Sequence, residues 1–127
     1  MLIPQGQVTG TGAFQIVNTS KGTTLATRAL VANTIQERTT GLLNRSSLEN
    51  GEGLIIPGCK RIHSIGMKFP IEVIFLSDDG QVVRCGVLTP GGFAGAAQSD
   101  VVIELPIGTI GKTGTLPGDY LETERVQ

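Results

Sequence analysis

The sequence predicts an α+β domain that is mainly β, a compact barrel-like or strongly curled antiparallel or mixed sheet of short strands with one helix. Three observations lead to this fold class. Glycine accounts for 18 of the 127 residues and proline for six, so turns recur along the whole chain. Between these turns lie about six to eight short apolar or alternating runs of the length typical of strands. One stretch has helix start signals, whereas a chain of alternating strands and helices would need several.

Length and charge limit the class of protein. A chain of 127 residues fits a single domain with one real core. We expect residues 1–22 to form a poorly anchored N-terminal arm with room for a short strand, and residues 23–127 to form the β-rich domain. Ten basic residues stand against 11 acidic ones. This balance argues against nucleic-acid binding, which needs a basic excess gathered on one surface.

Aromatic content and apolar run length exclude further classes. Four Phe, one Tyr and no Trp offer no obvious stacking platform for bases or sugars. No apolar run approaches the roughly 20 residues of a membrane span. The N-terminus lacks the basic start and apolar core of a secretory signal. These features predict a soluble chain and favour the cytoplasm over export. No cofactor is predicted.

The first half of the chain contains the one predicted helix. Residues 24–31 alternate apolar and polar side chains, as a strand with one buried face does. Thr34 and Glu37 then fit a capping box, in which the hydroxyl and the carboxylate each accept an amide of the first turn. We therefore expect a helix over about residues 34–43, followed by a polar loop and a short buried strand at residues 54–56.

The clearest hairpin joins residues 71–76 to residues 81–87 through a turn that ends in Asp79 and Gly80. Residues 71–76 are apolar on both faces except for Glu72. A run of this kind indicates a central strand that is covered on both sides.

The remaining segments predict short elements. Residues 88–99 are rich in Gly and Ala without a period, which predicts a flexible loop. Residues 100–105 are typical of a strand. The glycines within residues 106–118 allow at most a short helix, and residues 120–126 predict a final strand.

Several short motifs resemble a known family by their order and spacing. They are Arg38-x-x-Gly41-Leu42-x-x-Arg45-x-x-Leu48, Gly53-Leu54, Met67-Lys68-x-x-Ile71-Glu72-x-x-Phe75-x-x-x-x-Gly80-x-Val82, Glu104-Leu-Pro-x-Gly108-Thr109 and Pro117-Gly118-Asp119. From Thr24 to Glu122 the chain resembles the prokaryotic family named domain of unknown function 192. The resemblance implies a compact β-rich domain, often exported in other members, with no settled activity or cofactor. Many members carry aromatics just before the Met-Lys pair, where this chain has Ile65 and Gly66, so an aromatic pocket wall is not expected there.

Cys59, His63 and Met67 follow one another at intervals of four residues. In an extended segment all three point to one face, and thiolate, imidazole and thioether together suit Cu(I). Strand residues four apart are separated by about 13 Å, however, too far for one ion without a bend. Since Cys and Met are also common core residues, the preferred prediction is no metal site. With Cys85 as the second cysteine, free thiols are favoured over a disulfide.

Glu72 is the acid within the predicted central strand. A buried carboxylate is costly unless it is paired, so we expect a cation to lie beside it. Lys68, Arg38 and Arg45 are the expected partners. The simpler interpretation is an ion pair that ties helix to sheet, and the functional one is an acid in a pocket flanked by cations.

A set of polar and charged side chains is the candidate ligand site. The set comprises Arg38, Arg45, His63, Ser64, Lys68 and Glu72. We expect a curled sheet to bring them to one concave face, where they would bind a small polar or anionic ligand or a segment of a partner protein. A solvated helix face is the simpler interpretation of the two arginines.

Two other classes of function stay open. A hydrolase could use His63 or Glu72 as general base, although no nucleophile elbow and no third member of a triad can be identified. A purely structural or assembly module could act through the edges of the sheet. The sequence does not predict an oligomeric state.

Overall fold

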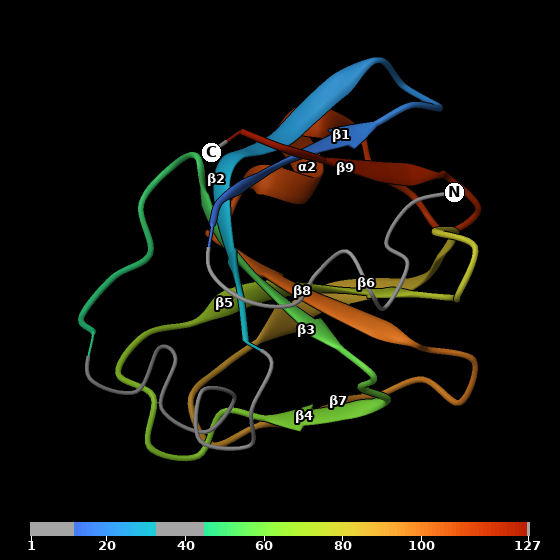
Figure 1. Ribbon diagram of the computed structural model, residues 1–127. Coiled ribbons are helices and arrows are strands. Elements are labelled where there is room, and N and C mark those ends of the chain that lie inside the picture. The colour runs from blue at the N-terminus through green and yellow to red at the C-terminus, as the bar shows by residue number, and fades with distance from the viewer. Residues whose placement is uncertain (1–11, 33–44, 127) are drawn as a thin grey trace.

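The computed structural model describes residues 12–32 and 45–126 (Figure 1). The helix predicted over residues 34–43 lies outside the described residues, and so does Arg38. The described part of the chain contains no helix of the length and apolarity needed to cross a bilayer.

The described residues form short strands and one short helix, which confirms the mainly β fold class. The strands are β1 (Phe14–Asn18), β2 (Thr23–Val31), β3 (Glu52–Pro57), β4 (Arg61–His63), β5 (Ile71–Leu76), β6 (Val82–Leu88), β7 (Phe93–Gly95), β8 (Val101–Leu105) and β9 (Leu121–Arg125). The helix is α2 (Thr109–Thr113), in the segment where the glycines left room for only a short one.

Seven strands make one curled sheet in the order β6-β5-β8-β3-β2-β1-β9. The β2–β3 pair is parallel and the other pairs are antiparallel, so the sheet is mixed. The curl brings its two end strands together, since the backbone N–H of Val82 donates to Asp119 and that of Leu121 donates to Gly80. The expected curled sheet is therefore present.

Two apolar cores lie on the two faces of this sheet. Ile74 and Leu76 of β5 point into the core that α2 covers, here called the helix-side core. Ile71, Val73 and Phe75 point into the other core, here called the ribbon-side core. All six residues of β5 are buried. The strand lies inside the sheet and is covered on both sides, as its run of apolar residues with the single acid Glu72 predicted.

The ribbon-side core is covered by a second, two-stranded sheet, here called the ribbon, made of β4 and β7. In Figure 1 the ribbon lies at the bottom, below β3 and β8, whereas α2 lies in the upper part of the view beside β1 and β9. Ile62 of β4 and Ala94 of β7 are partly buried against this core. The flexible loop predicted over residues 88–99 is therefore wrong in part, because residues 93–95 form a strand with a partner about 30 residues earlier.

Candidate ligand-binding site

Glu72, the acid of the central strand, is held by backbone amides. Its Oε1 accepts the N–H of Ile110 at 2.7 Å and its Oε2 accepts the N–H of Gly108 at 3.0 Å. The side chain shares the helix-side face with Ile74 and supports the first turn of α2. Within the described residues, the expected pairing with Lys68 or Arg45 is not formed. A short helix leaves its first amides without internal acceptors, and the carboxylate satisfies them.

Ser64 is buried, and its hydroxyl, backbone N–H and carbonyl all form hydrogen bonds within the protein. Its hydroxyl donates to the carbonyl of Thr89 at 2.5 Å and accepts the N–H of Gly92 at 2.9 Å. Its backbone N–H donates to Gly92, and its carbonyl accepts the N–H groups of Met67 and Gly91. Ser64 thereby ties the end of β4 to the loop before β7, so its hydrogen bonds stabilise the ribbon.

His63 lies on the opposite side of the sheet from Glu72. It belongs to β4, where Ile62 faces the ribbon-side core and the exposed His63 faces outward. Its Nδ1 accepts the N–H of Ile65 at 3.3 Å. The large sheet separates this imidazole from the Glu72 carboxylate, so the two groups do not share a hollow. The geometry therefore lends no support to a hydrolase in which they act together.

The two remaining described cations of the predicted set also lie apart. Arg45 Nη2 donates to Oε1 of Glu52 at 2.6 Å in a partly exposed ion pair. Lys68 is exposed in the loop between β4 and β5. The described members of the predicted set are thus spread over separate parts of the molecule and do not line one concave face.

The three residues considered as metal ligands do not converge. Cys59 is buried in the ribbon-side core, where its thiol donates to the carbonyl of Arg61 at 3.1 Å. Met67 packs against the same core, whereas His63 faces outward. The described residues hold no group of three or more His, Cys, Asp or Glu side chains arranged for a metal ion.

The two cysteines are free thiols on different faces of the sheet. Cys59 belongs to the ribbon-side core, and Cys85 packs against the helix-side core. Burial, together with the nearby charges of Glu72 and Asp119, raises the pKa of the Cys85 thiol. A raised pKa keeps a thiol protonated and less nucleophilic, which gives no support to a reactive cysteine at this position.

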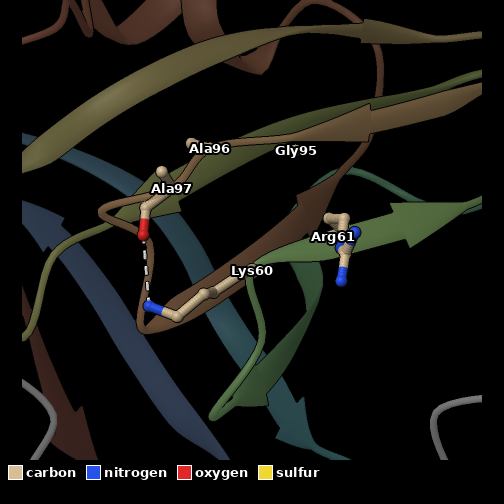
Figure 2. A pocket seen from close by; sticks show the side chains of 5 residues that line it. All are labelled: Lys60, Arg61, Gly95, Ala96 and Ala97. Atoms are coloured by element: carbon tan, nitrogen blue, oxygen red, sulfur yellow. Dashed lines mark hydrogen bonds between the residues drawn. The ribbon is translucent and has the colours of Figure 1, made fainter.

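A ligand-sized pocket lies at the end of the ribbon where β4 begins and β7 ends, here called the ribbon pocket. It has a volume of about 410 Å³ and is lined by Lys60, Arg61, Gly95, Ala96 and Ala97 (Figure 2). The close approach of its two walls requires a glycine. A Cβ on Gly95 would lie 2.8 Å from Cγ of Arg61 and 3.1 Å from the carbonyl oxygen of Lys60.

The ribbon pocket is cationic. Lys60 Nζ donates to the carbonyl of Ala97 at 3.2 Å (Figure 2). It also donates to the carbonyl of Ser99 at 2.9 Å. An ammonium has three N–H donors, so one is left for a ligand. Arg61 is exposed on β4, and Arg84 lies nearby, donating to the carbonyl of Gly95 at 2.8 Å. None of the described lining residues is acidic.

The sequence did not predict these pocket residues. The signals available were the adjacent cations Lys60 and Arg61 and the small residues at 95–97. Neither signal predicts a pocket by itself, because basic pairs and Gly-Ala stretches are common on protein surfaces. Only the pairing of β4 with β7 brings the cations and the small residues together.

A second polar cluster surrounds Asp119 and closes the curled sheet. The Asp119 carboxylate accepts hydrogen bonds from Asn18 Nδ2, from Lys21 Nζ and from the backbone N–H of Leu116. The same Asn18 amide group also donates to the hydroxyl of Thr115. These donors, with Asn18 first, lower the pKa of Asp119 from 3.8 to about 2. The cluster joins the β1–β2 turn to the segment before β9.

Asp119→Asn is expected to lower the midpoint of thermal unfolding at pH 7. The native carboxyl has a lowered pKa, so its contribution to stability is complete above pH 3.8 and is lost as the pH falls to about 2. The difference between variant and wild type should therefore shrink towards pH 2. Thermal unfolding followed by circular dichroism from pH 2 to pH 7 measures this, with Asp78→Asn in an exposed turn as control. An equal difference at both pH limits would contradict the prediction.

Fold and site define a small domain in which a curled mixed sheet carries a two-stranded ribbon with a cationic pocket at one end. Over most of this fold the sequence matches the model of a single family. The chain belongs to DUF192, the family described as an uncharacterized ACR, whose model matches residues 16–123. This confirms the resemblance found in the motifs.

Two solved structures are similar to this chain. A protein from Sinorhizobium meliloti 1021 that has been suggested to be a transcription regulator has a TM-score of 0.76 and 21% identity, with 90% of this chain and 94% of that chain covered. A protein of unknown function from Novosphingobium aromaticivorans DSM 12444 has a TM-score of 0.72 and 25% identity, with 88% and 84% covered. No curated protein matches this chain. The comparisons establish fold and family, and no activity.

Proposed function

We propose that this domain binds a small organic anion in the ribbon pocket. The acidic group of the ligand lies beside Lys60 and Arg61, and its apolar part lies against Ala96 and Ala97. The observation that carries the proposal is a pocket of about 410 Å³ that has two cations and no acid among its described lining residues. This volume falls in the range of known small-molecule sites, about 300–1,000 Å³.

The two cations have complementary roles. The Lys60 ammonium is already oriented by two carbonyl oxygens, so little side-chain entropy is lost when its third N–H meets a ligand. Arg61 offers a planar guanidinium whose paired N–H groups match a carboxylate or a phosphate. Together they favour binding of an anion over a neutral molecule of the same shape.

Binding without catalysis agrees best with the lining residues. Lysine, arginine, glycine and alanine make up the described lining, and this set contains no hydroxyl, thiol, imidazole or carboxyl group for acid–base or nucleophilic chemistry. The acid and the imidazole considered for a hydrolase lie on opposite sides of the large sheet. The domain is therefore proposed as a ligand-binding module.

Hexyl phosphate and hexanol test the proposal, because they share an apolar chain and differ in charge. We expect hexyl phosphate to raise the midpoint of thermal unfolding with increasing concentration and hexanol to have little effect. Arg61→Met and Lys60→Met should each weaken the binding of hexyl phosphate about tenfold or more in calorimetric titrations.

Lys68→Met is the matched control, since it removes an exposed cation that does not line the pocket. It should bind hexyl phosphate as the wild type does. Equal effects of hexyl phosphate and hexanol, or an equal loss of affinity in Lys68→Met and Arg61→Met, would overturn the proposal.

A further inference from the structure

The ribbon has an outer face that is distinct from the face it buries. Register pairs Arg61 with Gly95, Ile62 with Ala94, and His63 with Phe93. Ile62 and Ala94 pack against the ribbon-side core. Because side chains alternate along a strand, the other residues of the two strands lie on the outer face. This face therefore carries a cation, an imidazole and an aromatic ring next to the ribbon pocket.

Phe93 is unusually exposed for an aromatic ring. Its side chain is 73% exposed, the highest value among the large apolar residues described, whereas Phe14 and Phe75 are buried. The His63 ring lies beside it, with ring centroids 6.2 Å apart and a tilt of 52°. An aromatic ring that is exposed beside cations can stack on a planar ligand. The scarcity of aromatics in the composition had suggested no stacking platform, but one exposed ring is enough for one base.

The edges of the ribbon are less available than its face. Ala96 donates its N–H to the carbonyl of Lys60, and Ser64 donates its N–H to the carbonyl of Gly92. Between these two pairs, the backbone groups of successive residues point alternately towards the other strand of the ribbon (inward) and away from it (outward). The outward carbonyl of Arg61 accepts the thiol of Cys59. The outward carbonyl of Gly95 accepts the guanidinium of Arg84. Both edges are thus partly satisfied, which favours a ligand on the face over an added strand of a partner.

We infer that the outer face of the ribbon binds a nucleoside monophosphate, with the base on Phe93 and the phosphate at Arg61. This inference rests on the proposed function and names the class of anion. Phe93 and Gly95 are two residues apart on β7, about 7 Å along the strand. Arg61 lies directly across from Gly95. A ribose spans this interval between base and phosphate, so the two contacts can be made at the same time.

His63 is placed to contact the sugar between base and phosphate. It lies across from Phe93 and two residues from Arg61 on the same outer face. Its Nδ1 accepts the N–H of Ile65, so the neutral ring carries its proton on Nε2. Nε2–H can therefore donate to a ribose hydroxyl. This contact adds specificity for a sugar phosphate over an alkyl phosphate.

Calorimetric titrations with adenosine monophosphate, ribose 5-phosphate and hexyl phosphate test the inference. We expect adenosine monophosphate to bind about fivefold or more tightly than ribose 5-phosphate, because the base adds stacking. Phe93→Leu should abolish this advantage and leave the affinity for ribose 5-phosphate unchanged. Arg61→Met should weaken the binding of both sugar phosphates. Tyr120→Leu, which removes another exposed ring, is the matched control and should match the wild type.

The outcomes separate this inference from the proposed function. If hexyl phosphate binds through Arg61 but adenosine monophosphate binds no more tightly than ribose 5-phosphate, the nucleotide inference is overturned and the anion site stands. If Phe93→Leu and Tyr120→Leu lower the affinity for adenosine monophosphate equally, the inference is also overturned. If none of the three phosphates binds, both proposals are wrong. Thermal unfolding of each variant establishes that it is folded.

Discussion

Glu104→Gln is expected to remove a loss of folding stability that the wild type undergoes at neutral and alkaline pH. Relative to wild type, the free energy of unfolding of the variant should rise by about 3 kcal/mol between pH 4 and pH 8. For a domain of this size that corresponds to a gain on the order of 10 °C in the unfolding midpoint, measured against the difference at pH 4.

The reason is the position of Glu104 on β8 in the middle of the sheet. Its side chain is 7% exposed, and its neighbours across the ladder are Leu54 and Val73, both on the ribbon-side face. No described residue forms a hydrogen bond or an ion pair with its carboxyl group. Burial raises the pKa of this group from 4.5 to about 7. The native state therefore holds its proton more tightly than the unfolded state, and stability is lost as the pH rises through this range.

Urea unfolding of wild type and variant at half-unit steps from pH 4 to pH 8 measures the effect. Glu122→Gln, on exposed β9, controls for the loss of one negative charge elsewhere. A constant difference between Glu104→Gln and wild type over the whole range would contradict the prediction. The site proposals do not depend on this result, because Glu104 does not line the ribbon pocket.

Glu72→Ala is expected to lower the free energy of unfolding by about 3 kcal/mol at pH 7. The carboxylate accepts the N–H groups of Gly108 and Ile110, and its removal leaves both amides at the start of α2 without this acceptor. The lost side chain also opens space beside the helix-side core. Thermal and urea unfolding at pH 7 measure the change.

Glu72→Gln provides the graded comparison, since the amide keeps one of the two acceptor oxygens. It should fall between Glu72→Ala and wild type in stability. Binding of hexyl phosphate in the ribbon pocket should be unchanged in folded Glu72→Gln, because the residue lies on the other face of the sheet. An unchanged melting temperature with lost binding would contradict a structural role for Glu72.

Several elements were predictable because their signals are local. The apolar run at residues 71–76 and the Asp79-Gly80 turn predicted the β5–β6 hairpin, which is present with shifts of one residue at its ends. The same run, apolar except for Glu72, also predicted a strand buried on both faces, and every residue of β5 is buried. Frequent glycines between short runs predicted a curled, mainly β sheet. These signals act through backbone preferences and burial over a few neighbouring residues.

The candidate site was less predictable because it depends on contacts between distant segments. The backbone N–H groups that bind Glu72 come 36 and 38 residues later in the chain. A backbone donor cannot be recognised in the sequence, because every residue type except proline has one. Ser64 was predicted as a ligand-binding residue, but its hydroxyl fixes the loop that precedes β7. Phe93 lies in a stretch that resembles a loop, so its exposure and its neighbour His63 could not be inferred.

By itself the sequence determined the fold class, the family and the position of the buried strand β5. This was possible because burial patterns and turns depend on residues that follow one another in the chain. Only the tertiary structure decided that β4 pairs with β7, that the sheet divides His63 from Glu72, and that Lys60 and Arg61 line a pocket together with Gly95. The physical reason is that a strand's period indicates which residues share a face, whereas partner choice depends on the packing of the whole sheet.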